Sequence, residues 1–189
     1  MKCVKNFTTG WSGDQLKPLT EKSLNKLRGT WSEVLNADDY IKPLFDIDMK
    51  IAGSKEDKID YDKWINPIRE VMFSDMAEKV GEDRAELLCA SSSGWNEEKE
   101  SHYVSLHITF PRLKILFKNM PQLVEELGYT DEQVYSPEEN VEINWDIDRA
   151  IYGKERQCIR LINQDKPLKG GGRAGRKKMK HIAPNETEK

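Results

Sequence analysis

The most regular alternation of apolar and polar residues runs over 102–110, HYVSLHITF. Successive side chains of a β-strand point to opposite faces, so this pattern predicts a strand with one face in the core. The apolar face of that strand carries Val104, Leu106, Ile108 and Phe110. Ser105 and His107 therefore share the other, polar face.

A second strand is predicted over 40–51, which contains PLFDIDMK. Asp46 and Asp48 would project together from it, with Ile47 turned into the core. Like charges at this spacing repel each other, and a hard divalent cation such as magnesium or manganese would relieve the repulsion. The segment is therefore either a metal site or an exposed strand end that runs into a turn.

Further elements follow from periodicity and from turn residues. Helical spacing predicts helices over 20–36, 62–80 and 115–127, the last of which could begin only at Pro121. Short apolar runs predict strands over 86–91, 143–152 and 156–162, and the first of these could form a hairpin with 102–110. Polar loops are expected over 52–60 and 129–140. This mixture without strict alternation predicts the α+β class.

Composition limits the kind of protein. A chain of 189 residues suits one full domain with its own core. Its 33% charged residues, and the absence of a long apolar run or an apolar signal core, predict a soluble, intracellular protein without a membrane partner. Cys3, Cys89 and Cys158 are scattered and show neither a disulfide framework nor a zinc spacing.

The net charge of −3 hides an uneven distribution. The segment 166–180 contains seven lysines and arginines and no acid. We therefore expect a folded domain over 1–168 and a basic flexible tail or linker over 169–189. Such a tail could bind nucleic-acid phosphates or could simply be solvated.

A third polar cluster stands at 146–166. Asp146 and Asp148 again lie two positions apart, and Arg156, Arg160 and Lys166 follow them. Taken in order and spacing, LFDIDMK, VSLHITF and IDRAIYGKERQCIRLINQDKP resemble the motifs of the archaeo-eukaryotic primase superfamily, especially its primase-polymerase and large-DNA-virus primase branch. The resemblance spans about 43–168.

The resemblance implies a fold and a set of roles. The fold would be an RRM-like antiparallel catalytic sheet with packed helices, and 1–168 would be the primase-polymerase catalytic domain. Asp146 and Arg156 rank lower than their neighbours as site residues. The metal-binding, catalytic residues would be Asp46, Asp48 and Asp148, and the nucleotide-binding residues would be Ser105, His107, Arg160 and Lys166.

The activity implied by the resemblance is DNA-dependent nucleotidyl transfer by a primase or primase-polymerase. It would use two Mg²⁺ or Mn²⁺ ions, nucleoside triphosphates and a single-stranded DNA template. A replicative helicase, in cis or in trans, is an implied partner. The branch suggests a viral or mobile-element replication protein, which would act in the host cytoplasm or nucleus if viral.

One departure from the family pattern concerns phosphate binding. Relatives often carry a lysine two residues before the serine of the Ser-x-His strand, where this chain has Tyr103. Lys99 or His102, from the preceding segment, could compensate.

Two other functions are carried as alternatives. One is a catalytically inactive, primase-like domain that binds nucleic acid during replication. The other is a DxD metal-dependent phosphatase of the haloacid-dehalogenase type, which is disfavoured because Met49 and Lys50 follow the second aspartate. A rolling-circle endonuclease would need a histidine where Ser105 stands, so that class is excluded.

Overall fold

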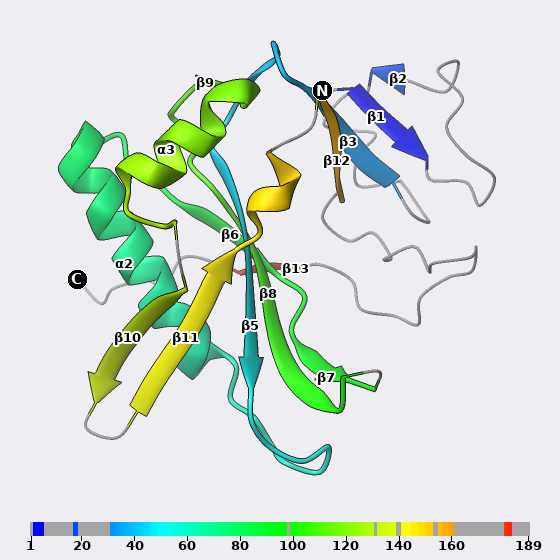
Figure 1. Cartoon of the computed structure of the whole chain (residues 1–189), viewed down its shortest axis with the longest axis vertical. Coiled ribbons are helices and arrows are strands. Elements are labelled where there is room, and N and C mark those ends of the chain that lie inside the picture. The colour runs from blue at the N-terminus through cyan, green and yellow to red at the C-terminus, as the bar shows by residue number, and fades with distance from the viewer. Residues whose placement is uncertain are drawn as a thin grey trace.

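The computed structural model describes residues 2–5, 17–18, 31–97, 99–130, 132–138, 141–152, 155–160 and 180–182. Within these ranges the fold is α+β, with antiparallel sheets and few helices, as the sequence predicts (Figure 1). The largest sheet, called the central sheet below, is 7-stranded. Its order is β10 (Gln133–Glu138), β11 (Val141–Ile147), β5 (Leu44–Ile51), β8 (Ser101–Thr109), β6 (Leu88–Ser91) and β13 (Lys180–Ile182), and β7 (Gly94–Asn96) also pairs with β8.

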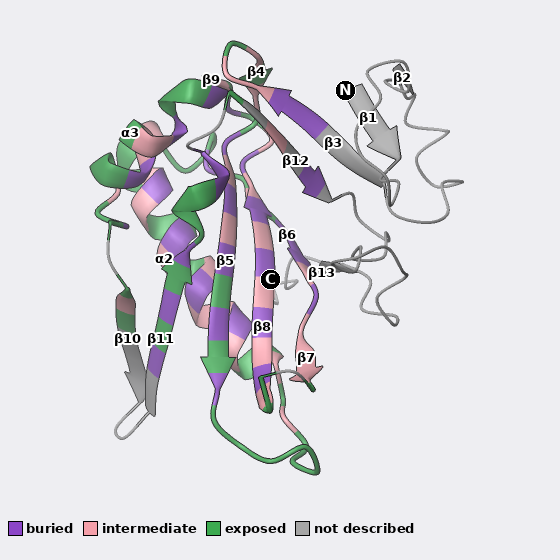
Figure 2. Ribbon diagram, turned by 45° about the vertical axis from the view of Figure 1, so that its right-hand side comes forward, coloured by how far each residue is buried: buried purple, intermediate pink, exposed green. Residues whose placement is uncertain are grey.

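The pairing of β5 with β8 forms the middle of the central sheet. The two strands are antiparallel from the Leu44–Thr109 pair to the Ile51–His102 pair. Buried and more exposed residues alternate along both strands (Figure 2). The alternation that predicted these two strands is therefore the alternation between the two faces of the sheet.

The predicted hairpin of 86–91 with 102–110 is confirmed. β6 and β7 pair with β8 in one continuous register, from Leu88–Thr109 to Asn96–Ser101. β7 therefore extends the ladder beyond β6. Lys99 lies in the remaining turn between β7 and β8.

The predicted helix over 62–80 is confirmed as α2 (Asp62–Val80), which runs behind the central sheet in Figure 2. It ends at Gly81, whose φ of 89° favours glycine. The helix buries Ile65, Ile68, Met72 and Met76 in the same core as the apolar face of β5 and β8. That face of the sheet is closed, because α2 and the core cover it.

The third predicted helix is shorter than expected. Ile115–Leu116 form β9, which pairs with β4 (Tyr40–Ile41). A 3-10 turn, η2 (Phe117–Asn119), precedes α3 (Met120–Glu126). The alternative start at Pro121 is close to the observed one, since proline fits the first helical turn.

The prediction of a helix over 20–36 is wrong for its last six residues, 31–36. Trp31–Asn36 form β3, an inner strand of a 4-stranded sheet ordered β12 (Arg156–Arg160), β3, β1 (Lys2–Lys5) and β2 (Lys17–Pro18). Pairing on both sides overrides the helical spacing of Trp31 and Leu35. The rest of the predicted helix lies outside the described residues.

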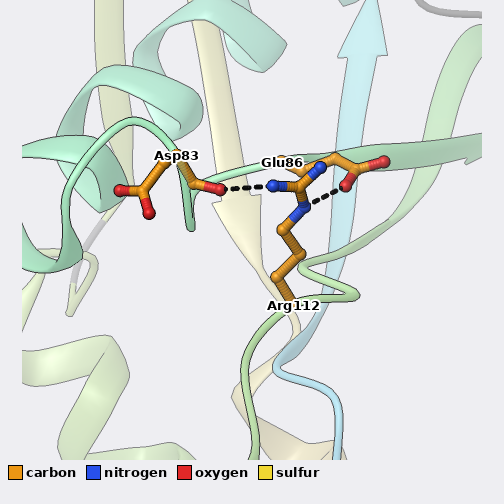
Figure 3. A network of polar contacts seen from close by, with 3 residues as sticks. All are labelled: Asp83, Glu86 and Arg112. Atoms are coloured by element: carbon orange, nitrogen blue, oxygen red, sulfur yellow. Dashed lines mark hydrogen bonds and ion pairs between the residues drawn. The ribbon is translucent and has the colours of Figure 1, made fainter.

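A polar contact fastens the connection after β8 to the segment before β6 (Figure 3). Arg112 Nε donates to Glu86 Oε2 at 2.6 Å, and Arg112 Nη1 donates to the Asp83 carbonyl oxygen at 2.8 Å. The Asp83 carboxylate takes no part in this contact.

Most of the predicted tail, 169–189, lies outside the described residues, so the boundary at 168 stays a prediction. Lys180–Ile182 are described, and they form β13 on the edge of the central sheet, paired with β6. In the described part of the chain, no helix has the length and apolar character needed to cross a membrane.

Candidate functional site

The two aspartates of β5 lie on the face of the central sheet that points away from α2. Their neighbours Phe45, Ile47 and Met49 are buried in the core, and alternation therefore turns Asp46 and Asp48 the other way. We call this side of the sheet the open face. It is defined by Asp46, Asp48, Lys50, Tyr103, Ser105, His107 and Asp146.

Asp46 lies beside His107. The two residues are cross-strand partners on β5 and β8, and His107 Nε2 lies 3.3 Å from Asp46 Oδ1. Their side chains keep exposed fractions of 13% for His107 and 21% for Asp46. The first motif and the second motif are thus in direct contact on a half-buried part of the sheet.

Asp48 has a different pair of neighbours. Ser105 is its partner on β8, and Asp146 is its partner on β11. Two carboxylates directly opposite each other on antiparallel strands repel, and they destabilise the pairing unless a cation lies between them. Asp48 and Asp146 are both exposed, so a cation from solution can reach them.

Asp148 is brought next to Asp46 through the backbone. The Asp148 N–H donates to the Asp46 carbonyl oxygen at 2.8 Å. One carboxylate oxygen of Asp148 accepts from the Ala150 N–H at 3.0 Å, and this caps the 3-10 turn η3 (Arg149–Ile151). The predicted third carboxylate is therefore beside the first, but Oδ1 is engaged in holding the turn.

Tyr152 fixes this turn against β5. Its hydroxyl donates to the Leu44 carbonyl oxygen at 2.7 Å, and its ring makes an edge contact with Phe117. Burial raises the pKa of the Tyr152 hydroxyl, and the nearby Asp46 carboxylate raises it further. Tyr152 therefore stays a neutral donor, and the aromatic of the third motif has a structural part in placing Asp148 near Asp46.

The two remaining predicted residues are not in the central sheet as described. Arg160 ends β12 in the 4-stranded sheet, where its partner is Ser32, and the structure describes only its backbone. Lys166 lies outside the described residues. Their predicted contact with a triphosphate stays a prediction.

The donor set fits a hard divalent cation by residue type. Asp46, Asp48, Asp146 and Asp148 offer carboxylate oxygens from two adjacent strands, and Mg²⁺ and Mn²⁺ prefer such oxygens. In the described part of the chain, no three His, Cys, Asp or Glu side chains are already grouped to hold a metal ion. Metal binding at this face would therefore require the aspartate side chains to rotate toward one another.

Asp146 ranks below Asp148 in the family resemblance, and its position in the sheet adds an observation that the sequence alone does not contain. The resemblance favoured Asp148, whereas the register makes Asp146 the direct partner of Asp48. The repeated sequence DID at 46–48 and 146–148 was the available signal, because it places two equivalent aspartates on each strand segment.

Comparison of the chain with models of protein families, with curated proteins and with solved structures gave no match.

Proposed function

We propose that this chain is a DNA-dependent nucleotidyltransferase of the primase or primase-polymerase type, with an RRM-like catalytic sheet. It would add nucleotides to a primer or start one on a single-stranded DNA template. The proposal rests on the resemblance of the three motifs and on the arrangement of the open face.

One observation carries the proposal. Motifs that are about a hundred residues apart in the chain meet on one side of three adjacent strands. Asp46 faces His107, while Asp48 lies between Ser105 and Asp146. A set of solvated strand ends would have no reason to place its acids in register beside a serine and a histidine.

The chemistry of these residue types suits phosphoryl transfer. Asp46, Asp48 and Asp148, with Asp146, would hold the Mg²⁺ or Mn²⁺ ions, which supply charge neutralisation at the attacking hydroxyl and the leaving pyrophosphate. The Ser105 hydroxyl and the His107 ring can donate hydrogen bonds to phosphate oxygens. The covered face would keep β5, β8 and β11 rigid, and rigid placement is the main contribution of a protein to this reaction.

Two rival functions make different demands. A haloacid-dehalogenase-like phosphatase needs parallel strands, and β5 pairs antiparallel with both of its neighbours. An inactive nucleic-acid-binding domain needs no metal, and the test below separates it from the proposed enzyme.

The test is template-directed synthesis by the full chain. The reactions contain single-stranded DNA, with and without an annealed primer, nucleoside triphosphates, and Mg²⁺ or Mn²⁺. We expect the wild-type chain to give products whose sequence follows the template. The Asp46→Asn and Asp48→Asn variants should give about a thousandfold less product.

Asp83→Asn is a matched control, because it removes an exposed carboxylate that is not on a strand of the open face and keeps the carbonyl contact with Arg112. Equal synthesis by the Asp48→Asn and Asp83→Asn variants would contradict the assignment. Absence of product with either metal, together with tight and salt-sensitive binding of single-stranded DNA, would replace the proposal with the binding domain.

A further inference from the structure

The open face carries many negative charges for a site that would receive a triphosphate. Four aspartates approach it from β5 and from the end of β11. Within the described strands β5, β7, β8 and β11, Lys50 is the one lysine or arginine. A triphosphate that enters this site therefore meets repulsion unless cations offset the charge, and Lys50 is the nearest candidate by register.

Lys50 stands one step along the sheet from the candidate metal-binding residues. It is two residues beyond Asp48 on the same face of β5, and its partner on β8 is Tyr103. The next pair along is Asp48 with Ser105. Lys50 is exposed, and its ammonium makes no hydrogen bond or ion pair with any residue of the described ranges.

His102 and Lys99 are the two residues that could replace the family lysine in phosphate binding. The structure excludes His102 from the open face and does not place Lys99 on it. His102 points to the covered face and is buried. Its Nε2 donates to the Ser54 carbonyl oxygen at 2.7 Å, and Nδ1 pairs with the Tyr61 hydroxyl at 2.8 Å. Both ring nitrogens are therefore already used. Lys99 lies in the turn beyond β7 rather than on a strand of the open face.

Tyr103 gives the same end of the site a flat surface. Its partner on β7 is Gly94, which has no side chain to cover the tyrosine ring from that side. A half-buried tyrosine next to an exposed lysine combines a surface for a ring with a point charge for a phosphate.

We propose that Lys50 binds the phosphates of the incoming nucleoside triphosphate at the Ser105 end of the candidate site, next to Tyr103. This inference rests on the proposed function and assigns a residue that the family motifs do not name. Lys50 would supply the positive charge that relatives place at the position of Tyr103. The register makes this exchange possible, since the two positions are cross-strand partners.

The test is equilibrium binding of inorganic tripolyphosphate and of dATP to the full chain in the presence of MgCl₂, measured by calorimetry. Lys50→Gln removes a charged hydrogen-bond donor, so it should raise both dissociation constants about tenfold. Lys50→Arg should bind nearly as well as the wild type. Lys58→Gln removes one exposed lysine from the 52–60 loop and is the matched control, with no expected change.

The outcomes separate this inference from the proposed function. If Lys50→Gln and Lys58→Gln bind alike while the wild type synthesises DNA, the Lys50 assignment fails and the function stands. If Lys50→Gln binds weakly but the wild type makes no product, the Lys50 assignment stands and the function fails. If the wild type binds neither tripolyphosphate nor dATP, both are contradicted.

Discussion

The two faces of the central sheet are made by alternate residues of the same strands, yet they differ in burial and in charge. On the covered face, Phe45, Ile47 and Leu106 are fully buried against α2 and the rest of the core. On the open face, Asp48 lies opposite another carboxylate, and Lys50 is exposed. The covered face is stabilised by burial of apolar side chains, whereas on the open face the carboxylates of Asp48 and Asp146 repel each other.

This difference indicates that the open face, rather than the covered face, is the candidate functional surface. A residue that costs stability persists only where something else requires it, and strained or repulsive arrangements gather at functional sites. The covered face explains the fold without reference to any ligand. The proposed cation and anionic substrate would offset the repulsion between carboxylates on the open face.

The largest expected effect is a loss of activity from a change on the open face. Asp48→Asn should lower template-directed synthesis about a thousandfold, because it removes a charge that would hold the metal ions. The same change should raise the free energy of unfolding by about 0.5 kcal/mol, since it relieves repulsion with Asp146. Primer-extension rates and urea denaturation of the same preparation measure both effects. Loss of activity through unfolding of this variant would contradict the prediction that the open face contributes to activity rather than to stability.

The next largest effect is a loss of stability from a change at Ile47, which lies next to Asp48 in sequence but on the covered face. Ile47→Ala should lower the free energy of unfolding by about 2 to 5 kcal/mol, because it leaves a cavity in a core where Ile47 is completely buried. Urea denaturation is again the measurement. Near-native stability of this variant would show that the covered face does not determine the fold.

His102 is the polar exception on the covered face, and its replacement should have a smaller effect. His102→Phe removes the hydrogen bonds to Ser54 and Tyr61 and leaves two polar groups to find other partners. We expect a loss of about 1 to 3 kcal/mol in the free energy of unfolding and faster hydrogen exchange in the 52–60 loop. Tyr61→Phe removes one of the two contacts and should give the smaller change. Unchanged exchange in that loop would contradict the role of His102 as its anchor.

Cys89 gives the smallest effect at neutral pH, because its contribution to the free energy of unfolding changes only above pH 9.0. Burial raises the pKa of the Cys89 thiol to about 12, from an ordinary value near 9.0. The unfolded chain therefore loses this proton first as the pH rises, and stability falls between pH 9.0 and about 12. The wild type should lose up to about 1.4 kcal/mol per pH unit more than Cys89→Ala in this range. Parallel losses in the two proteins would show that the thiol is not buried as described.

The parts of the fold that were predictable are those where a local pattern and the tertiary structure agree. The alternation over 102–110 and the apolar stripe that ends at Gly81 each specify one element. Trp31 and Leu35 mislead, because their helical spacing is compatible with a strand that gains partners on both sides. The loop expected over 129–140 is wrong for 133–138, which form β10, because this strand is stabilised by its pairing with β11 rather than by a clear pattern of its own.

The candidate site was predictable as residue types but not as contacts. Spacing placed Asp46 with Asp48 and Ser105 with His107 on common faces, and the structure brings these pairs together. The roles of Asp146 and Lys50 depend on the register between strands far apart in sequence, which no single strand pattern contains. The resemblance placed Arg160 at the nucleotide, and the structure gives only its strand, β12 in the 4-stranded sheet, so its contact with a nucleotide stays a prediction.

The most direct test of the open face as a metal-dependent site is a Mn²⁺ titration of the ¹⁵N-labelled full chain, followed by nuclear magnetic resonance. Paramagnetic broadening marks the amides nearest to the bound ion. We expect the signals of residues around Asp46, Asp48 and Asp146 to broaden first, before those of α2, and we expect Asp48→Asn to weaken the effect. Broadening centred on another acidic segment, or equal broadening in wild type and Asp48→Asn, would contradict this expectation.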